Sequence, residues 1–301
     1  VKEGDMLTYE LLLDEKTGKK AAATVTVLKK DEASLLTSAT PKMKELKEKK
    51  KERAEQPKSD ASAFSDLGLD GEIVKALGFL GYSQPTPIQS QAIPAVLGGK
   101  DLVGLAQTGT GKTAAFALPL IQQLLMNPIA LKARSARTII LSPTRELALQ
   151  IHDAFVSFGK RLPLNFTHAI GGAPIRKQMR DLSKGVDILV ATPGRLEDLV
   201  EQKGLRLDET KFLVLDEADQ MLDIGFLPAV KRIISKVSKE RQTLLFSATM
   251  SKEIKKLTET YLKDPVQVSV TPENSTVEKI EQSLMHLSKQ NKGLALQRIV
   301  S

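Results

Sequence analysis

The chain has no cysteine and no tryptophan, and only three of its 301 residues are histidine. Without thiols it has no disulfide, thiolate metal site or thiol catalysis, and this fits the reducing cytoplasm in which we expect it. The three histidines, at positions 152, 168 and 286, have no spacing typical of a zinc site. No apolar run approaches the roughly 18 residues of a membrane span, so we expect no membrane partner.

What the chain does have is an excess of positive charge. Its 44 Lys and Arg outnumber its 36 Asp and Glu, which gives a formal net charge of +8. Half of this excess lies in residues 41–58, where eight Lys/Arg face four Glu (8 − 4 = +4). A basic balance favours anionic partners, with nucleic acid first among them. We interpret residues 32–60 as a basic linker, with an auxiliary RNA-tethering role as the alternative.

The first 31 residues predict two strands. "MLTYELLL" and "AAATVTVL" have strand-forming composition, and "DEKTGKK" between them is typical of a turn. This short β-rich piece resembles the last hairpin of a cold-shock (OB-type) domain. We therefore treat residues 1–31 as a partial hairpin of that kind.

Residues 61–274 predict an α/β domain. Helix-like stretches at 114–125 and 145–162 alternate with short apolar runs. These runs are 101–106, 138–142, 165–170, 187–192, 211–216 and 243–249. Continuous apolar strands between helices indicate a mostly parallel sheet covered by helices on both faces. Ligands bind such sheets at the carboxyl ends of the strands.

The segment "AQTGTGKT" follows one of these strands and opens a helix, which is the setting of a phosphate-binding loop. Its glycines allow backbone N–H groups to surround phosphate oxygens at a helix N-terminus. Ala106 replaces the first glycine of the usual pattern. The predicted ATP-binding residues here are Ala106, Gln107, Thr108, Gly109, Thr110, Gly111, Lys112 and Thr113. Thr113 would also ligate Mg²⁺, and Lys112 would hold the β and γ phosphates.

Three carboxylates follow the apolar run "FLVL". Carboxylates this close repel one another, so a cation bound with an anionic substrate is the expected reason for them. We assign Asp216 to Mg²⁺ and Glu217 to the attacking water, with Lys112 completing the catalytic set. Asp219 would accept hydrogen bonds from Ser247 or Thr249 and couple neighbouring strand ends. The alternative is a solvated acidic turn.

With these motifs in order, residues 64–270 resemble the first RecA-like domain of a DEAD-box RNA helicase, nearest to the bacterial RhlE-like branch. The four letters of that family's name stand at residues 216–219. The family's adenine motif is present as "GYSQPTPIQ". The resemblance implies that Gln89 binds adenine, with Phe64 or Tyr82 against the face of the base.

The resemblance also implies RNA contacts at the ends of three strands. These are Pro143, Thr144, Arg145, Gly171, Gly172, Thr192, Pro193, Gly194 and Arg195. Arginine, hydroxyl and backbone N–H groups suit contacts to phosphate and sugar. None of these side chains offers an obvious base-reading set, so we expect binding that is largely independent of RNA sequence.

Residues 275–301 are expected to be the interdomain linker and the truncated start of a second RecA-like domain. Members of this family carry arginine fingers in that domain, and such a residue is worth about 10³–10⁵ in rate. The chain is therefore expected to be a weakly active fragment of an ATP-dependent RNA helicase. Two alternatives share its core: a DNA helicase or translocase, and an ATP-gated RNA clamp or scaffold.

Overall fold

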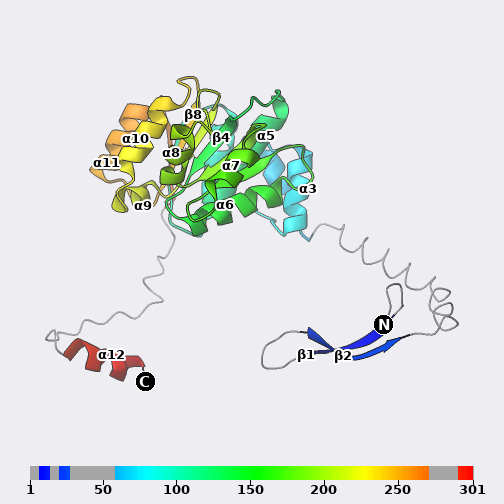
Figure 1. Ribbon diagram of the computed structural model, residues 1–301. Helices are drawn as coiled ribbons and strands as arrows, with labels where there is room; N and C mark the ends of the chain where they lie inside the picture. The colour runs from blue at the N-terminus through cyan, green and yellow to red at the C-terminus, as the bar shows by residue number, and fades with distance from the viewer. Residues whose placement is uncertain (1–6, 14–19, 28–57, 271–290, 301) are drawn as a thin grey trace. The chain divides into compact units, whose positions relative to one another are not determined.

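The computed structural model describes residues 7–13, 20–27, 58–270 and 291–300 (Figure 1). The chain divides into two compact units, residues 1–57 and 58–301. In the first, strands β1 (Leu7–Leu13) and β2 (Lys20–Val27) pair antiparallel, with an irregular register after Glu10. Both predicted strands are present. The likeness to a cold-shock hairpin stays a prediction, and residues 41–57 of the basic segment lie outside the described residues.

The second unit contains a seven-stranded sheet whose pairings are all parallel. Its strand order is β5-β6-β4-β7-β8-β3-β9. The strands are β3 (Leu102–Leu105), β4 (Ala136–Leu141), β5 (Phe166–Ala169), β6 (Val186–Ala191), β7 (Phe212–Leu215), β8 (Gln242–Ser247) and β9 (Val266–Ser269). The six predicted strands are all present, and the α/β fold class is confirmed.

Strand β9 has no counterpart among the sequence predictions. It lies at one edge of the sheet and pairs only with β3. Of its four residues only Val268 is buried, and Val266 is exposed. An edge strand of this kind has no continuous apolar run, so the pattern that revealed the other six strands is absent from it.

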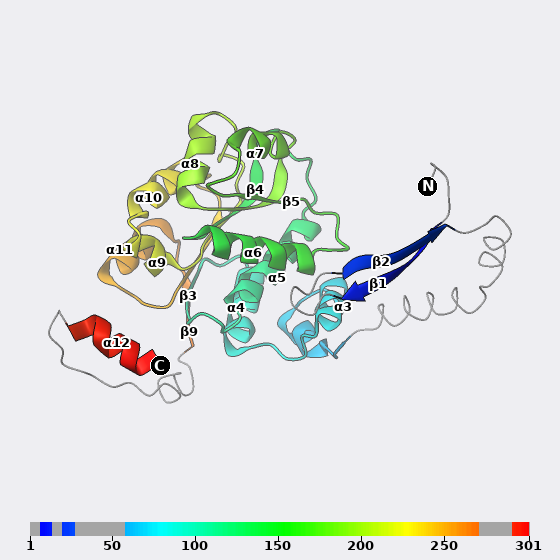
Figure 2. The same ribbon diagram turned by 60° about the horizontal axis from the view of Figure 1, so that its bottom comes forward.

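Helices cover both faces of the sheet (Figure 2). One face packs against η1 (Ser62–Leu67), α3 (Gly71–Leu80), α4 (Pro87–Leu97), α5 (Lys112–Met126) and α6 (Arg145–Phe158). The other face packs against α7 (Ile175–Asp181), α8 (Pro193–Glu201), α9 (Ala218–Asp223), α10 (Leu227–Lys236) and α11 (Lys252–Tyr261). A further helix, α12 (Lys292–Val300), follows residues outside the described ranges. Much of the segment expected to hold the interdomain linker and the start of a second domain, residues 275–301, also lies outside them.

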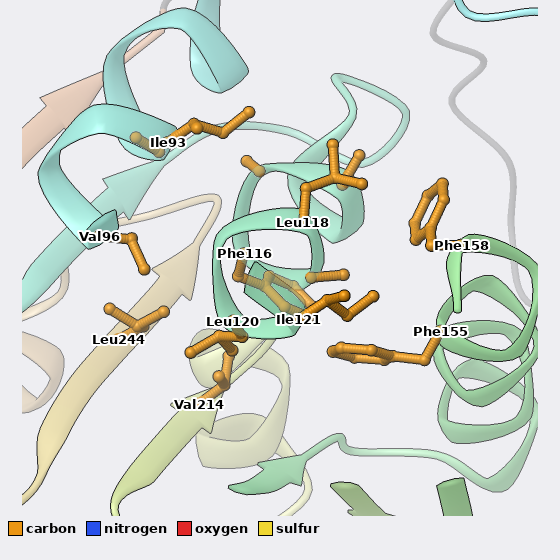
Figure 3. Packing of buried hydrophobic residues seen from close by; sticks show 14 of the residues in the cluster. Ile93, Val96, Phe116, Leu118, Leu120, Ile121, Phe155, Phe158, Val214 and Leu244 are labelled. Carbon is orange, nitrogen blue, oxygen red and sulfur yellow. The ribbon is translucent and has the colours of Figure 1, made fainter. Parts of the chain in front are cut away.

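The two faces divide the core into two clusters, because successive residues of a strand point to opposite faces. In β7, Val214 joins one cluster while Leu213 and Leu215 join the other. In the first cluster α5 and α6 lie side by side on the sheet, and Phe116 of α5 packs against Phe155 of α6 and Phe246 of β8 (Figure 3). Burial on both faces explains why these strands are continuously apolar in sequence.

Among the residues that the structure describes, no helix combines the length and apolar character that crossing a membrane requires.

Candidate functional site

The phosphate-loop segment forms a tight turn between β3 and α5. Gly109 and Gly111 have φ values of +85° and +92°, in the left-handed region that favours glycine. The Thr110 hydroxyl donates to the carbonyl of Gln107 at 2.7 Å, which closes the turn on itself. Ala106 is buried, and its N–H donates to the carbonyl of Ser247 at the end of β8. The turn presents the N-terminus of a 15-residue helix, a suitable position for an anion.

Gln89 connects this turn to α4. Its side chain is only 2% exposed, and its Nε2 donates to the Gly111 carbonyl at 3.1 Å. Its Oε1 accepts from the backbone N–H of Thr86 at 2.9 Å, as part of a capping box at the start of α4. A Cβ atom added at Gly111 would collide with the Gln89 amide. The predicted adenine residue therefore also fixes the position of the phosphate loop.

The two aromatic residues assigned to adenine differ in exposure. Phe64 is 0% exposed and belongs to the core, where its edge faces Tyr82 with ring centroids 6.4 Å apart. Tyr82 is half-buried, and burial raises the pKa of its hydroxyl. Of the two, only Tyr82 is partly exposed, whereas Phe64 is enclosed in the core and is not accessible to a base.

Lys112 and Glu217 form a buried ion pair. Lys112 Nζ lies 2.7 Å from Glu217 Oε1, and the two residues are 5% and 9% exposed. Thr108 Oγ1 lies 3.4 Å from the same carboxylate oxygen. The structure thus brings the phosphate loop and the acidic turn after β7 into direct contact, although 105 residues separate them in sequence. Thr113 follows Lys112 in the first turn of α5.

Glu217 has a left-handed backbone, with φ 52° and ψ 53°, and directly precedes α9. Few non-glycine residues adopt this conformation, and such strain clusters at functional sites. It turns the chain sharply after β7, so that neighbouring carboxylates point in different directions. Asp216 accepts the N–H of Glu217 at 3.1 Å, whereas the Glu217 side chain reaches Lys112.

Asp216 is 2% exposed, and burial raises the pKa of its carboxyl to about 7, against the lowering effect of Lys112. A carboxyl group in this setting gains from a nearby cation. No group of three or more His, Asp or Glu in the described ranges could hold a metal by itself. The residues present fit Mg²⁺, which takes few protein ligands and keeps oxygens of water and phosphate.

Asp219 links the acidic turn to the end of β8. Its Oδ2 accepts from the backbone N–H groups of Ala248 and Thr249 at 3.1 and 3.0 Å, and from the Thr249 hydroxyl at 3.1 Å. Ser247 does not take part, because its hydroxyl donates to the Thr249 carbonyl at 2.8 Å. Of the two expected donors, Thr249 is therefore bonded to Asp219, and Ser247 braces Thr249.

A groove of about 420 Å³ lies beyond the ends of β4, β5 and β6. Its lining comprises Pro143, Thr144, Arg145, Glu146, Gly171, Thr192, Gly194, Arg195 and Phe226. Gly172 and Pro193 adjoin lining residues in sequence. Residues from the three segments assigned to RNA thus meet in one groove, although the sequence shows only that each follows a strand.

Two helices begin at this groove. Thr144 caps α6, with its hydroxyl accepting the N–H of Leu147 at 3.2 Å, and Thr192 precedes α8. Free N–H groups at helix N-termini favour anions such as phosphate. The groove therefore offers backbone donors and positive potential from two directions.

The two arginines of the groove have different surroundings. Arg145 is exposed, and within the described part of the chain its guanidinium has no hydrogen bond or ion pair. The side chain of Arg195 is only 12% exposed. Its Nη1 donates to the Ala173 carbonyl and to Gln178 Oε1, both at 2.9 Å.

Sequence reasoning missed two residues here, Phe226 and Gln178. Phe226 lines the groove from the loop before α10, and Gln178 supports the groove from α7. Phe226 had a weak signal, an aromatic residue directly after a glycine. Gln178 had none, because a glutamine in a polar helix reads as a surface residue.

The family model of the DEAD/DEAH box helicase matches residues 86–257. The chain is 45% identical over 240 residues to RNA helicase CrhR of Synechocystis sp., covering 79% of this chain and 48% of that protein. It is 46% identical over 220 residues to ATP-dependent RNA helicase CshA of Limosilactobacillus reuteri, covering 73% and 43%. It spans about half the length, or less, of these two relatives.

Solved structures agree. A DEAD box protein from the hyperthermophile Methanococcus jannaschii has a TM-score of 0.63 and 36% identity, covering 79% of this chain and 63% of that one. The structure of a hypothetical ATP-dependent RNA helicase from Sulfolobus tokodaii has a TM-score of 0.61 and 32% identity, covering 67% of this chain and 57% of that one. The described parallel sheet is thus the RecA-like fold of these proteins, and the chain belongs to the DEAD/DEAH box helicase family.

Proposed function

We propose that this chain is the ATP-binding part of an ATP-dependent RNA helicase, which couples ATP hydrolysis to RNA binding and local separation of a duplex. One observation carries this proposal. Lys112 of the phosphate loop lies 2.7 Å from Glu217 and next to buried Asp216, at the edge of the sheet that also forms the groove. The similarity to two proteins named as RNA helicases supports the choice of RNA.

ATP would bind at the phosphate loop. Backbone N–H groups from Gln107 to Thr113 would surround the phosphates, and Lys112 would exchange its bond to Glu217 for one to a phosphate oxygen. Gln89 and Tyr82 would hold the adenine, with Phe64 behind Tyr82. The buried carboxylate that Lys112 contacts holds the amine in position before the phosphate arrives.

Mg²⁺ would be held by Thr113 and, directly or through water, by Asp216. When bound, it would supply positive charge that offsets the negative charge developing on the phosphates. The raised pKa of Asp216 supports this role, because a buried carboxyl with a free oxygen gains most from a cation.

Glu217 would orient or deprotonate the water that attacks the γ-phosphate. While Glu217 is paired with Lys112, its Oε1 is occupied by the bond to Nζ and does not face an attacking water. Transfer of Lys112 to a phosphate would free this carboxylate for the proton. ATP binding would thus place the base in its active arrangement.

RNA would bind in the groove through its phosphates and sugars. Arg145 supplies an exposed guanidinium, and the starts of α6 and α8 supply backbone donors. The groove contains no arrangement of side chains that would read a base edge, so binding would depend little on sequence. Asp219, bonded to the end of β8, would couple the acidic turn to neighbouring strand ends.

Replacing Glu217 by Gln in the parent protein tests the assignment. Turnover of ATP should fall to background while ATP binding is retained, because the amide accepts no proton but fills the same volume. Stimulation by RNA and by DNA strands of the same sequence should be compared in the unaltered protein. Retained turnover in the variant would refute the role of Glu217, and equal stimulation by DNA would refute RNA as the preferred partner.

A further inference from the structure

The groove depends on a short loop that follows β5, residues 170–173. Gly172 has φ +82°, which places it in the left-handed region. A Cβ atom added at Gly172 would lie 2.5 Å from Arg145 Nη1, and one added at Gly171 would lie 3.2 Å from Nη2. The guanidinium of Arg145 therefore lies directly against the backbone of the two glycines. The backbone of this loop therefore forms one wall of the space that the guanidinium occupies.

Two side chains outside this contact hold the loop at both ends. Gln178 Nε2 donates to the Ile170 carbonyl at 3.0 Å, just before the glycine pair. Arg195 Nη1 donates to the Ala173 carbonyl at 2.9 Å, just after it. The two side chains also bond to each other, from Arg195 Nη1 to Gln178 Oε1 at 2.9 Å. The loop is thus fastened at both ends by one connected set of hydrogen bonds.

Burial makes this set costly to break. Gln178 is 4% exposed and the Arg195 side chain 12% exposed, and Arg195 Nε also lies 3.5 Å from Asp198 Oδ2. Removing one member leaves buried polar groups without hydrogen-bond partners. In a solvent-exposed set, water would take the place of the lost partner. Both ends of the amide are assigned by their partners, because a carbonyl faces one end and a guanidinium the other.

We propose that Gln178 and Arg195 are positioning residues that clamp the glycine pair and thereby place Arg145 for an RNA phosphate. The proposal rests on the groove being the RNA site. It divides the work of the two arginines: exposed Arg145 contacts the phosphate, and enclosed Arg195 acts through the loop. Gln178 never reaches the RNA, yet RNA affinity depends on it.

The test is a salt series of RNA binding. Fluorescence anisotropy of a labelled oligouridylate is measured with the full chain and with its Gln178→Leu, Arg145→Gln and doubly substituted variants. Losing one phosphate contact should weaken binding roughly tenfold. It should also reduce the slope of log affinity against log salt by about 0.7 for a single strand. Gln178→Leu should reproduce both changes of Arg145→Gln, and the double variant should add nothing further.

Arg195→Gln separates the two possible roles of this arginine. As a positioning residue it should also lower the slope by about 0.7, with no further drop when combined with Arg145→Gln. If Arg195 itself contacts a phosphate, the slope of log affinity against log salt should fall by about 1.4 in the variant that carries both substitutions, the sum of two contacts. That result would overturn its place in the clamp.

Gln242→Leu is the matched control. Gln242 is 7% exposed, and its Nε2 donates to the carbonyls of Val96 and Lys100 at the opposite end of the sheet. The Gln242→Leu variant also loses a buried glutamine that donates to backbone carbonyls, but far from the groove. It should leave the slope of log affinity against log salt unchanged. If Gln178→Leu does not melt cooperatively, Gln178→Glu replaces it: it keeps the acceptor for Arg195, loses the donor to Ile170 and adds a negative charge that faces Arg195.

The outcomes separate this proposal from the function on which it rests. If Arg145→Gln lowers the salt slope and Gln178→Leu leaves it unchanged, the positioning role of Gln178 is refuted, while the assignment of the groove to RNA is retained. Additive losses in the double variant would also contradict the clamp, because Gln178 would then act by another route. If no variant in the groove changes RNA binding, the groove is not the RNA site and both proposals fail.

Discussion

The phosphate-loop region and the groove lie at the same edge of one sheet but are built on opposite principles. At the phosphate loop the functional groups are ionisable and buried: Lys112, Asp216 and Glu217 are 9% exposed or less, and Lys112 is paired with Glu217. In the groove they are backbone N–H groups, hydroxyls and one exposed arginine. The first site should fail abruptly when one partner is removed, and the second should weaken by degrees.

The largest expected effect follows from removing Lys112. Lys112→Ala leaves two buried carboxylates without their cation, which should cost about 3 kcal/mol or more of unfolding free energy and abolish ATP binding. Urea unfolding and nucleotide titration measure the two losses. Lys132→Ala is the control, because its ion pair with Glu209 is 62% exposed on the lysine side and should be worth less than about 1 kcal/mol. Equal losses in both variants would contradict the contrast between buried and exposed charge.

The second effect depends on pH. The pKa of Asp216 rises from 3.8 in the unfolded chain to about 7 in the folded one, because the carboxyl is buried. Folding therefore favours the protonated form, so this contribution to stability is complete below about pH 4 and is lost as pH rises through about 7. Without Mg²⁺ and nucleotide, the Asp216→Asn variant should become more stable than the unsubstituted chain as the pH rises from about 4 to 7. The difference should grow by up to ~1.4 kcal/mol per pH unit.

Urea unfolding of both chains at several pH values between about 5 and 8 measures this difference. A constant difference between them across that window would show that Asp216 does not titrate there. Mg²⁺ and nucleotide should be added in a second series, where the ionised carboxylate becomes useful and the order of stability should reverse at high pH.

Sequence reasoning did well where function depends on neighbouring residues. The phosphate loop and the acidic turn are continuous segments, and β7 was apparent because all of "FLVL" lies between two helical layers. It failed where an element is exposed or where distant segments meet. Strand β9 buries one side chain, and Gln178 becomes buried only when α7, α8 and the loop after β5 pack together.

A third, smaller effect tests the groove. Gly172→Ala adds a Cβ at φ +82° that meets Arg145, so RNA affinity should fall roughly tenfold while ATP affinity is retained. Gly99→Ala is the control for backbone strain alone, since Gly99 has φ +73° and nothing within 4 Å of an added Cβ. If both variants bind RNA equally, the contact between Gly172 and Arg145 is not important for binding.

The smallest effect concerns the link between the acidic turn and β8. Thr249→Val removes one of three hydrogen bonds to Asp219 and leaves both backbone donors in place. The unfolding free energy should fall by about 1 kcal/mol, with ATP affinity unchanged. A loss as large as that of Lys112→Ala would mean that this link is part of the buried charge network.

The most direct test of the account is ATP hydrolysis by this chain and by its full-length parent, each with and without single-stranded RNA. The chain carries the nucleotide residues and the groove, and it spans about half the length of its curated relatives. The account predicts turnover that RNA stimulates in the parent and that stays near background in the chain alone. Strong hydrolysis by the chain alone, or a parent that ignores RNA, would contradict it.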